Sequence, residues 1–405
     1  MRIWLRLLLG VGIGVLLGLY LPDRAGDTGA LFSGLSAVVV NVGRFFLFPL
    51  VFFSAISAVD ELRDQSKLLA VVLSTLLLVA ATTLGSVIVS MAMILIFAPE
   101  RIPPILQEGR PEQIESVGTI VGDIFPRNLF SIFAGDGAAL LPLVVLAVIL
   151  GAVLAYDRHL TDPVAAVVDS ASRIFYRLSS LVVEFIGIGL IAVAAALFFQ
   201  LRRTVELAIY SQLLLVLAVS IALIILVVYP LVLYLYRRRS RPIHWLSTMV
   251  APALQAAASG DVYFAYPTLV HVTSKEREIE RPRGATILPV ATLFGRAGSA
   301  AVAAATFVVV IRSYTALEIG VGEVLWILLF AGLFSVALSR FPAAGVTVLL
   351  GTLATRYGQG MEEAYLIVFP VLPLLLRLGA LLDTVTAGFI LELLEQAGGS
   401  DSPAG

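Results

Sequence analysis

The sequence predicts an all-α polytopic membrane protein with eight transmembrane helices and two re-entrant helical hairpins. Of its 405 residues, 59% are hydrophobic and only 14% are charged, whereas soluble domains carry roughly 25% charged residues. Apolar stretches long enough to cross a bilayer recur along the chain, separated by prolines and charges, and two further stretches are interrupted at their centres. This composition excludes soluble enzyme classes and intrinsic disorder.

The composition also limits the possible chemistry. A formal net charge of −1 provides no basic surface for nucleic acid. The absence of cysteine excludes disulfides, thiolate metal sites and cysteine nucleophiles. His159, His244 and His271 are not spaced as metal ligands, and no nucleophile elbow, zinc-binding helix or phosphate-binding loop occurs in the sequence. We therefore expect no enzymatic activity, no metal site and no cofactor.

The first two-thirds of the chain predict six ordinary spans. A hydrocarbon core about 30 Å thick requires about 20 apolar residues in a helix. The first stretch ends at Leu21-Pro22-Asp23 without a small-residue cleavage site, so we expect a retained span rather than a signal peptide. The six stretches are 3–21, 36–58, 67–98, 139–156, 180–200 and 205–236.

The last third alternates interrupted and continuous apolar segments. Segment 245–272 has Ser259, Gly260 and Asp261 at its centre, and segment 323–357 is interrupted between residues 339 and 345. The second segment would be about 52 Å long as one helix, too long for an upright span. Each is followed by an apolar helix, at 284–311 and 364–395, which indicates an internal repeat of hairpin and helix. Paired interruptions of this kind mark the binding site of many transporters.

The distribution of basic residues predicts a cytoplasmic N-terminus. With that orientation, 15 Lys and Arg residues fall in cytoplasmic loops and eight in external loops, as the positive-inside rule requires. The remaining four lie in apolar segments, where each charge needs a partner or a function. These four are Arg44, Arg296, Arg340 and Arg377.

Short motifs occur in an order that resembles the dicarboxylate/amino acid:cation symporter family, of the glutamate-transporter type. The resemblance covers nearly the whole chain. The motifs are Phe46-Leu47-Phe48-Pro49-Leu50-Val51-Phe52-Phe53-Ser54, Pro126-Arg127-Asn128-Leu129-Phe130 with Leu141-Pro142, Glu184-Phe185-Ile186-Gly187-Ile188-Gly189, Leu288-Pro289-Val290-Ala291-Thr292 and Phe341-Pro342-Ala343-Ala344-Gly345.

This resemblance implies a homotrimer in a bacterial inner membrane, built from inverted repeats. A static scaffold domain would carry a mobile transport domain that moves a small anionic or zwitterionic substrate, such as a dicarboxylate or amino acid, as an elevator. The scaffold would comprise 1–66 and 99–200. The transport domain would comprise 67–98, 201–244, 245–311 (first hairpin and seventh span) and 312–395 (second hairpin and eighth span), and 396–405 is expected to be a disordered tail.

The residues that would bind sodium in the family are largely replaced. Where its seventh span has Asn-Met-Asp-Gly, this chain has Gly295-Arg296-Ala297-Gly298, so a carboxylate is lost and a guanidinium appears. In the last span an ungapped register places Asp383 at the family's Asn and Ala387 at its final Asp. Leu376 and Gly379 stand at the substrate-binding Asp and Arg, although a small gap would let Arg377 replace the missing Arg. The remnants of the cation sites are Thr82, Thr83, Gly295 and Gly298.

The candidate substrate site combines the two interruptions with the charged residues near them. Its residues are Ser259, Gly260, Asp261, Arg296, Arg340, Pro342, Ala343, Gly345, Arg377 and Asp383.

Each charged residue of this candidate site has two open interpretations. Arg296 is either a tethered cation in place of sodium, facing Asp383 or Asp261, or a structural or snorkelling residue. Arg340 is either a ligand of a substrate carboxylate or an exposed rim charge. The two aspartates either carry protons or merely neutralise Arg296 and Arg377.

Outside the candidate site, Arg44 is expected to snorkel from near the start of the second span. The function predicted is a secondary transporter whose sodium coupling is weakened, lost or replaced. The alternative is a non-transporting receptor, anion channel or scaffold protein with the same fold.

Overall fold

A computed structural model describes residues 3–23, 26–64, 67–103, 128–134, 140–156, 158–202, 207–236, 242–276, 281–315, 319–358 and 360–398. All regular elements in these ranges are helices. The Pro126-Arg127 part of one motif, the basic run 237–241 and the end of the predicted tail, 399–405, lie outside the described residues.

Eight helical segments of the described ranges are long and apolar enough to cross a membrane, which confirms a polytopic helical protein. The predicted span 139–156 is represented by a shorter helix, Leu140–Leu154, whereas Val321–Arg340, predicted as part of a hairpin, is long enough. The eight are Ile3–Tyr20, Asp27–Leu62, Leu68–Phe97, Leu160–Arg202, Leu207–Tyr236, Pro282–Tyr314, Val321–Arg340 and Ala364–Glu395.

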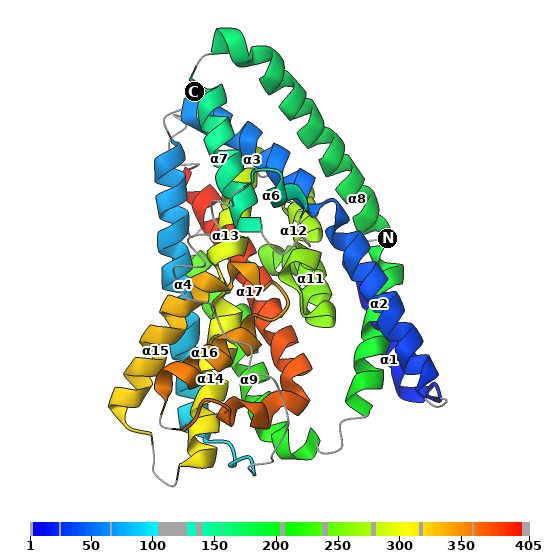
Figure 1. The fold of residues 1–405 in the computed structure, drawn as a ribbon, viewed down its shortest axis with the longest axis vertical. Helices are drawn as coiled ribbons and strands as arrows, with labels where there is room; N and C mark the ends of the chain where they lie inside the picture. The colour runs from blue at the N-terminus through cyan, green and yellow to red at the C-terminus, as the bar shows by residue number, and fades with distance from the viewer. Residues whose placement is uncertain are drawn as a thin grey trace.

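The N-terminal helices assemble around one very long helix. This helix, α8 (Arg158–Arg202), has 45 residues and is therefore about 68 Å long. It packs against α1 (Ile3–Tyr20), α2 (Asp27–Phe45) and α3 (Leu47–Asp64), and α3 also packs against α7 (Leu140–Leu154). Figure 1 shows α1, α2 and α8 together at one side of the molecule. A short helix, α6 (Ser131–Ala134), precedes α7.

Glycines set the distance between α1 and α8. Gly10, Gly14 and Gly18 recur every fourth residue and are buried. A Cβ on Gly14 would lie 2.7 Å from the Cβ of Ala194 and would also collide with the Ile191 carbonyl. Small residues at this spacing allow two backbones to approach closely in a membrane.

Replacing Gly14 with alanine is therefore expected to lower stability by about 1–3 kcal/mol, because the backbones of α1 and α8 must separate. Gly12→Ala is the matched control, since nothing lies within 4 Å of a Cβ at that position. Thermal unfolding of both variants in the same detergent, followed by size-exclusion chromatography, measures the difference. Equal stability of the two variants would contradict this packing.

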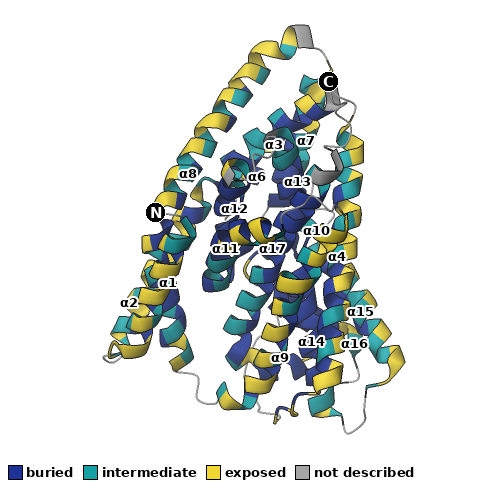
Figure 2. Cartoon of the chain, turned by 180° about the vertical axis from the view of Figure 1, so that it is seen from behind, coloured by how far each residue is buried: buried dark blue, intermediate teal, exposed yellow. Residues whose placement is uncertain are grey.

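The C-terminal helices surround a central buried helix, α14 (Ala297–Tyr314), of which residues 297–311 are all buried. Figure 2 shows this interior in dark blue, with exposed residues concentrated on the outer helices. Large apolar side chains on those outer faces, such as Leu77 and Leu329, are exposed, as expected for a surface in contact with lipid. The helices packed against α14 are α4 (Leu68–Phe97), α9 (Ser211–Leu223), α15 (Val321–Ser335), α16 (Gly345–Tyr357) and α17 (Leu372–Gly398). Helix α13 (Arg281–Phe294) precedes α14 in the chain and packs against α3, α4 and α17.

Shorter elements complete this region. A 3₁₀-helix, η1 (Leu207–Tyr210), precedes α9, and a π-helix, η2 (Ile224–Val228), joins α9 to α10 (Tyr229–Tyr236). Another 3₁₀-helix, η4 (Ala364–Val371), leads into α17. The predicted spans 205–236 and 364–395 thus contain short non-α segments near or within their apolar runs.

Both predicted interruptions are present as breaks between helices. The first lies between α11 (Pro242–Ser259) and α12 (Val262–Glu276), where Gly260 adopts a φ of 75° that only glycine accepts readily. The second lies after the 3₁₀-helix η3 (Val336–Arg340) and before α16. Helices α11 and α12 pack against each other and lie between the α1–α2–α8 group and α17 (Figure 1).

Three predicted spans have different limits in the structure. The fifth span is not 180–200 but Leu160–Arg202, within the long helix α8. The second span is not 36–58 but Asp27–Leu62, with a bend at Phe46 between α2 and α3. The seventh span, predicted as one helix over 284–311, is interrupted at Gly295 and Arg296, where α13 ends and α14 begins. Arg296 has a φ of −92° and a ψ of 43° at this break.

Candidate functional site

The break between α13 and α14 places Arg296 in the interior. Its side chain is 0% exposed, and its Nη1 lies 3.6 Å from Oδ2 of Asp383 on α17. The Cζ atom lies 5.6 Å from the centre of the Tyr263 ring, within the range of a cation–π interaction. The structure therefore brings Arg296 and Asp383 together, which is one of the two pairings that the sequence left open.

Asp383 is fixed at the N-terminus of α14. Its Oδ1 accepts hydrogen bonds from the backbone N–H groups of Gly298, at 2.6 Å, and Ser299, at 3.1 Å. Its Oδ2 accepts one from the Ser299 hydroxyl at 2.7 Å. A carboxylate is favourable at this end of a helix because the first N–H groups have no partner within the helix. Asp383 thus stabilises the start of α14 as well as Arg296.

Glycine at position 298 permits this arrangement. A Cβ there would collide with the Gly379 carbonyl and lie 2.8 Å from the Asp383 backbone nitrogen. Gly298, predicted as a cation-site remnant, therefore contacts α17 backbone to backbone in the structure. This close approach brings the Asp383 carboxylate within reach of the N-terminal N–H groups of α14.

The Arg296 guanidinium is buried without a full set of hydrogen-bond partners in the part of the chain that the structure describes. Nε, Nη1 and Nη2 are all buried and have no hydrogen-bond partner among the described residues. Asp383 supplies opposite charge at 3.6 Å, beyond normal hydrogen-bond distance. Buried donors without partners are costly, and a guanidinium presents its donors in a geometry that matches a carboxylate. Arg296 is therefore suited to receive an anionic ligand.

Asp261 pairs with a residue that the sequence placed elsewhere. It is 2% exposed, and its Oδ2 forms an ion pair with Nη2 of Arg44 on α2. Its Oδ1 accepts the Tyr263 N–H at 2.9 Å. The predicted pairing of Asp261 with Arg296 or Arg377 is wrong. Arg44, which was predicted to snorkel toward a membrane surface, instead directs its guanidinium at this buried carboxylate.

Arg377 bonds to backbone carbonyls rather than to a carboxylate. Its Nε donates to Ala258 O at 3.1 Å and its Nη1 donates to Pro373 O at 2.7 Å. Its Cγ also lies 3.3 Å from the position of a Cβ on Gly260. Arg377 therefore connects α17 to the end of α11 and contacts the turn at Gly260. Beside this turn, the Ser259 hydroxyl donates a hydrogen bond to the Gln255 carbonyl within α11.

The two interrupted segments meet through Tyr263. Its hydroxyl donates to Ser339 O at 2.7 Å, and its ring is fully buried beside Arg296. The second interruption continues through Arg340, Pro342 and Ala343, of which Arg340 and Ala343 are partly or fully exposed. The sequence prediction omitted Tyr263; its position two residues after the first interruption was the available signal.

Gly345 joins the second interruption to the Asp383 network. A Cβ at this position would lie 2.8 Å from Oγ of Ser299, whose hydroxyl donates to Asp383. The start of α16 therefore packs directly on the start of α14. Glycine is required there because any side chain would displace Ser299.

The Tyr263→Phe variant is expected to lose about 1 kcal/mol of stability, since only the hydrogen bond to Ser339 is removed. It should also open the contact between the two interruptions. The chain has no cysteine, so a single Ala343→Cys label reports this opening through its rate of reaction with a thiol reagent. Tyr266→Phe is the control, and equal labelling rates in both variants would contradict the assignment.

The two threonines predicted as remnants of the cation sites, Thr82 and Thr83, lie in different environments. Thr82 donates to Leu78 O at 2.7 Å in its own helix and lines an apolar cavity of about 300 Å³ between α4, η2 and α17. Thr83 is 3% exposed, and its hydroxyl has no partner among the described residues. It lies one turn beyond Val79, whose Cγ2 is 3.7 Å from the position of a Cβ on Gly295. Thr83 therefore lies on the α4 face that packs at the Arg296 break.

Comparison with known protein families identifies the family of the chain. A sequence model of the Sodium:dicarboxylate symporter family matches residues 3–388, which is nearly the entire chain. The chain belongs to this family. The predicted family is thereby confirmed, and it is a family of membrane transporters, not of enzymes. No curated protein matches the chain significantly.

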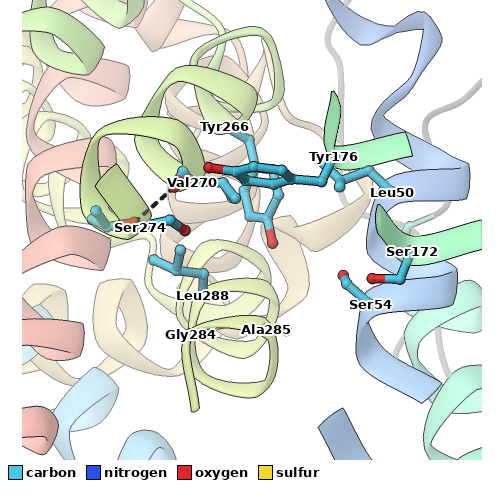
Figure 3. Close-up of a pocket in the computed structure, with 11 residues that line it drawn as sticks. Leu50, Ser54, Ser172, Tyr176, Tyr266, Val270, Ser274, Gly284, Ala285 and Leu288 are labelled. Carbon is cyan, nitrogen blue, oxygen red and sulfur yellow. Dashed lines mark hydrogen bonds between the residues drawn. The ribbon is translucent and has the colours of Figure 1, made fainter. Parts of the chain in front are cut away.

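This member of the symporter family also contains a cavity of about 270 Å³. The cavity lies between α3 and α8 on one side and α12 and α13 on the other. In Figure 3, Ser54 of α3 and Ser172 of α8 lie on one wall, and Val270, Ser274 and Leu288 lie on the opposite wall. Six of the lining residues carry hydroxyl groups, and none is charged. They are Ser54, Ser172, Tyr176, Tyr266, Thr273 and Ser274.

Proposed function

We propose that this protein is a secondary transporter of a small carboxylate-bearing substrate, in which Arg296 supplies a fixed positive charge in place of a cotransported sodium ion. The observation that carries this proposal is the wholly buried Arg296 guanidinium beside Asp383, with donors that have no hydrogen-bond partner among the described residues. Substrate carboxylate would complete the bonding of this guanidinium.

The charges around Arg296 disfavour a sodium ion at the same place. Hard cations bind to oxygen ligands, above all carboxylates. Asp383 is already engaged by the start of α14 and by Arg296, and position 297, at the family's carboxylate, is alanine. A guanidinium at this place would repel a second cation, so the site has the electrostatics of an already occupied cation site.

The proposed movement is an elevator. The helices around α8 form the scaffold domain, in a homotrimer, and the helices around α14 form the transport domain. The interrupted pairs α11–α12 and α15–α16 would be re-entrant hairpins, since their helices break at Gly260 and after Arg340. Their tips meet at the Tyr263–Ser339 hydrogen bond, and substrate would bind between this contact and Arg296. Alternating access would expose it to each side in turn.

Uptake into proteoliposomes tests the proposal. Radiolabelled C4 dicarboxylates, acidic amino acids and monocarboxylates are offered first as a panel under a sodium gradient, and then with potassium replacing all sodium. We expect at least one radiolabelled substrate to enter the vesicles down its own gradient at the same initial rate in both conditions. Strict dependence on sodium would contradict the tethered cation but not the transporter.

Exchange measurements distinguish this function from its alternative. A transporter preloaded with unlabelled substrate accelerates the entry of labelled substrate, whereas a receptor or scaffold protein does not, and an anion channel carries current without exchange. Absence of both exchange and binding across the whole panel would contradict a transport function.

A further inference from the structure

The ion pair between Arg44 and Asp261 connects the two groups of helices at the middle of the Asp27–Leu62 span. Arg44 lies 17 residues after Asp27 and 18 before Leu62 in its span, which places it about 25 Å along the helix from either end. Asp261 is its opposite charge, from the tip of the first interrupted pair.

Few other groups compensate the charges of this pair. The Arg44 side chain is 27% exposed and Asp261 is 2% exposed, and Nε of Arg44 has no hydrogen-bond partner among the described residues. A charge inside a membrane protein is stable only when it is paired or hydrated. Separation of the two side chains would therefore leave the buried Asp261 carboxylate and the partly buried Arg44 guanidinium poorly compensated.

A close packing contact lies beside the pair. The Phe264 ring of α12 lies directly against the backbone of Gly43 of α2, so that a Cβ on Gly43 would collide with the ring. Charge and packing thus hold the start of α12 against the C-terminal end of α2. The contact joins helices that the proposed function assigns to the transport domain and the scaffold domain respectively.

We propose that the Arg44–Asp261 pair is an interdomain latch that fixes the height of the transport domain in this conformation. The inference rests on the proposed elevator. A contact that exists in only one of two conformations shifts their populations by its interaction free energy. Arg44 is thus a positioning residue, which sets the position of the carrier without contacting substrate.

Distances between the two domains test the latch. Because the chain contains no cysteine, spin labels are introduced at Ile174→Cys on α8 and Leu329→Cys on α15, both exposed positions. The distance distribution is measured by pulsed electron paramagnetic resonance in the full-length protein in proteoliposomes. The key variant, Arg44→Gln with Asp261→Asn, removes both charges and leaves neither unpaired.

We expect this neutral pair to shift the population ratio toward a second distance by about tenfold, within the usual range of such couplings. The exchanged pair, Arg44→Asp with Asp261→Arg, should restore the distribution of the unmodified protein. Gly43→Ala, which keeps both charges but displaces Phe264, should shift it in the same direction as the neutral pair. The neutral pair should alter the maximal uptake rate while leaving KM unchanged.

An unchanged distance distribution in the neutral pair would overturn the latch. A shift seen only in Gly43→Ala would also overturn it, because packing alone would then hold the transport domain in this conformation. If the proposed function itself is wrong, the unmodified protein will transport no substrate of the uptake panel. The distances between the spin labels can still be measured in that case, so the two failures are distinguishable. If a single-charge variant fails to fold, the neutral and exchanged pairs still decide the question.

Discussion

Replacing Asp383 with alanine is expected to cause the largest loss of stability of any single substitution in the site. It leaves the fully buried Arg296 without its opposite charge and removes the acceptor of three hydrogen bonds at the start of α14. Removing one partner of a buried pair typically costs about 3–5 kcal/mol. Thermal unfolding in detergent, measured by fluorescence-detected size exclusion, gives the comparison.

The matched control is the exposed pair of Asp169 and Arg173 on α8, 2.8 Å apart and one turn from each other. Asp169→Ala should cost less than about 1 kcal/mol, because water and salt screen a surface pair. The double variant Asp383→Asn with Arg296→Met should recover much of the lost stability, since no unpaired charge remains. A folded, equally stable Asp383→Ala protein would contradict the structural role of this carboxylate.

Replacing Arg296 with methionine is expected to have the largest effect on transport. Methionine fills much of the same volume and removes only the charge and its donors. Hydrogen bonds to charged groups contribute about 1.5–3 kcal/mol, so the loss of a guanidinium–carboxylate contact should lower sodium-free uptake on the order of a hundredfold. Asp383 then becomes available to a mobile cation.

We therefore expect sodium to restore part of the uptake by Arg296→Met, and to have no effect on the unmodified protein. Arg296→Lys serves as the control, because it retains the charge but not the planar set of donors, and it should stay independent of sodium with a raised KM. Uptake by Arg296→Met that matches the unmodified protein in both salts would show that Arg296 is peripheral to transport.

Much of the fold was predictable because its determinants are local. The runs of apolar residues predict the helices, and Gly260 and the Phe341-Pro342 pair interrupt them at the predicted places. The break at Gly295 and Arg296 was missed because it lies inside a long, mostly apolar run, where an isolated glycine is tolerated in a helix. What fixes it is a non-local interaction, since Asp383 binds the N–H groups that the break exposes.

The candidate site was predictable in its residues but not in its pairings. Arg296 and Asp383 were recognised as charges in apolar sequence, and they do pair. The partner of Asp261 was missed because Arg44 was expected near a membrane surface. Polar residues such as Asn41 lower the hydropathy before it, although the span extends back to Asp27. A pairing between distant segments depends on tertiary packing and is not encoded in either segment alone.

The most direct test of the tethered cation is the movement of sodium itself. Purified protein in proteoliposomes is given an inward gradient of a transported carboxylate in the presence of radioactive sodium, and the entry of both labels is counted over the same interval. We predict that sodium entry stays at the level of protein-free vesicles while the carboxylate enters down its gradient. Sodium entry that rises in proportion to carboxylate entry would contradict the claim that Arg296 has taken the place of the ion.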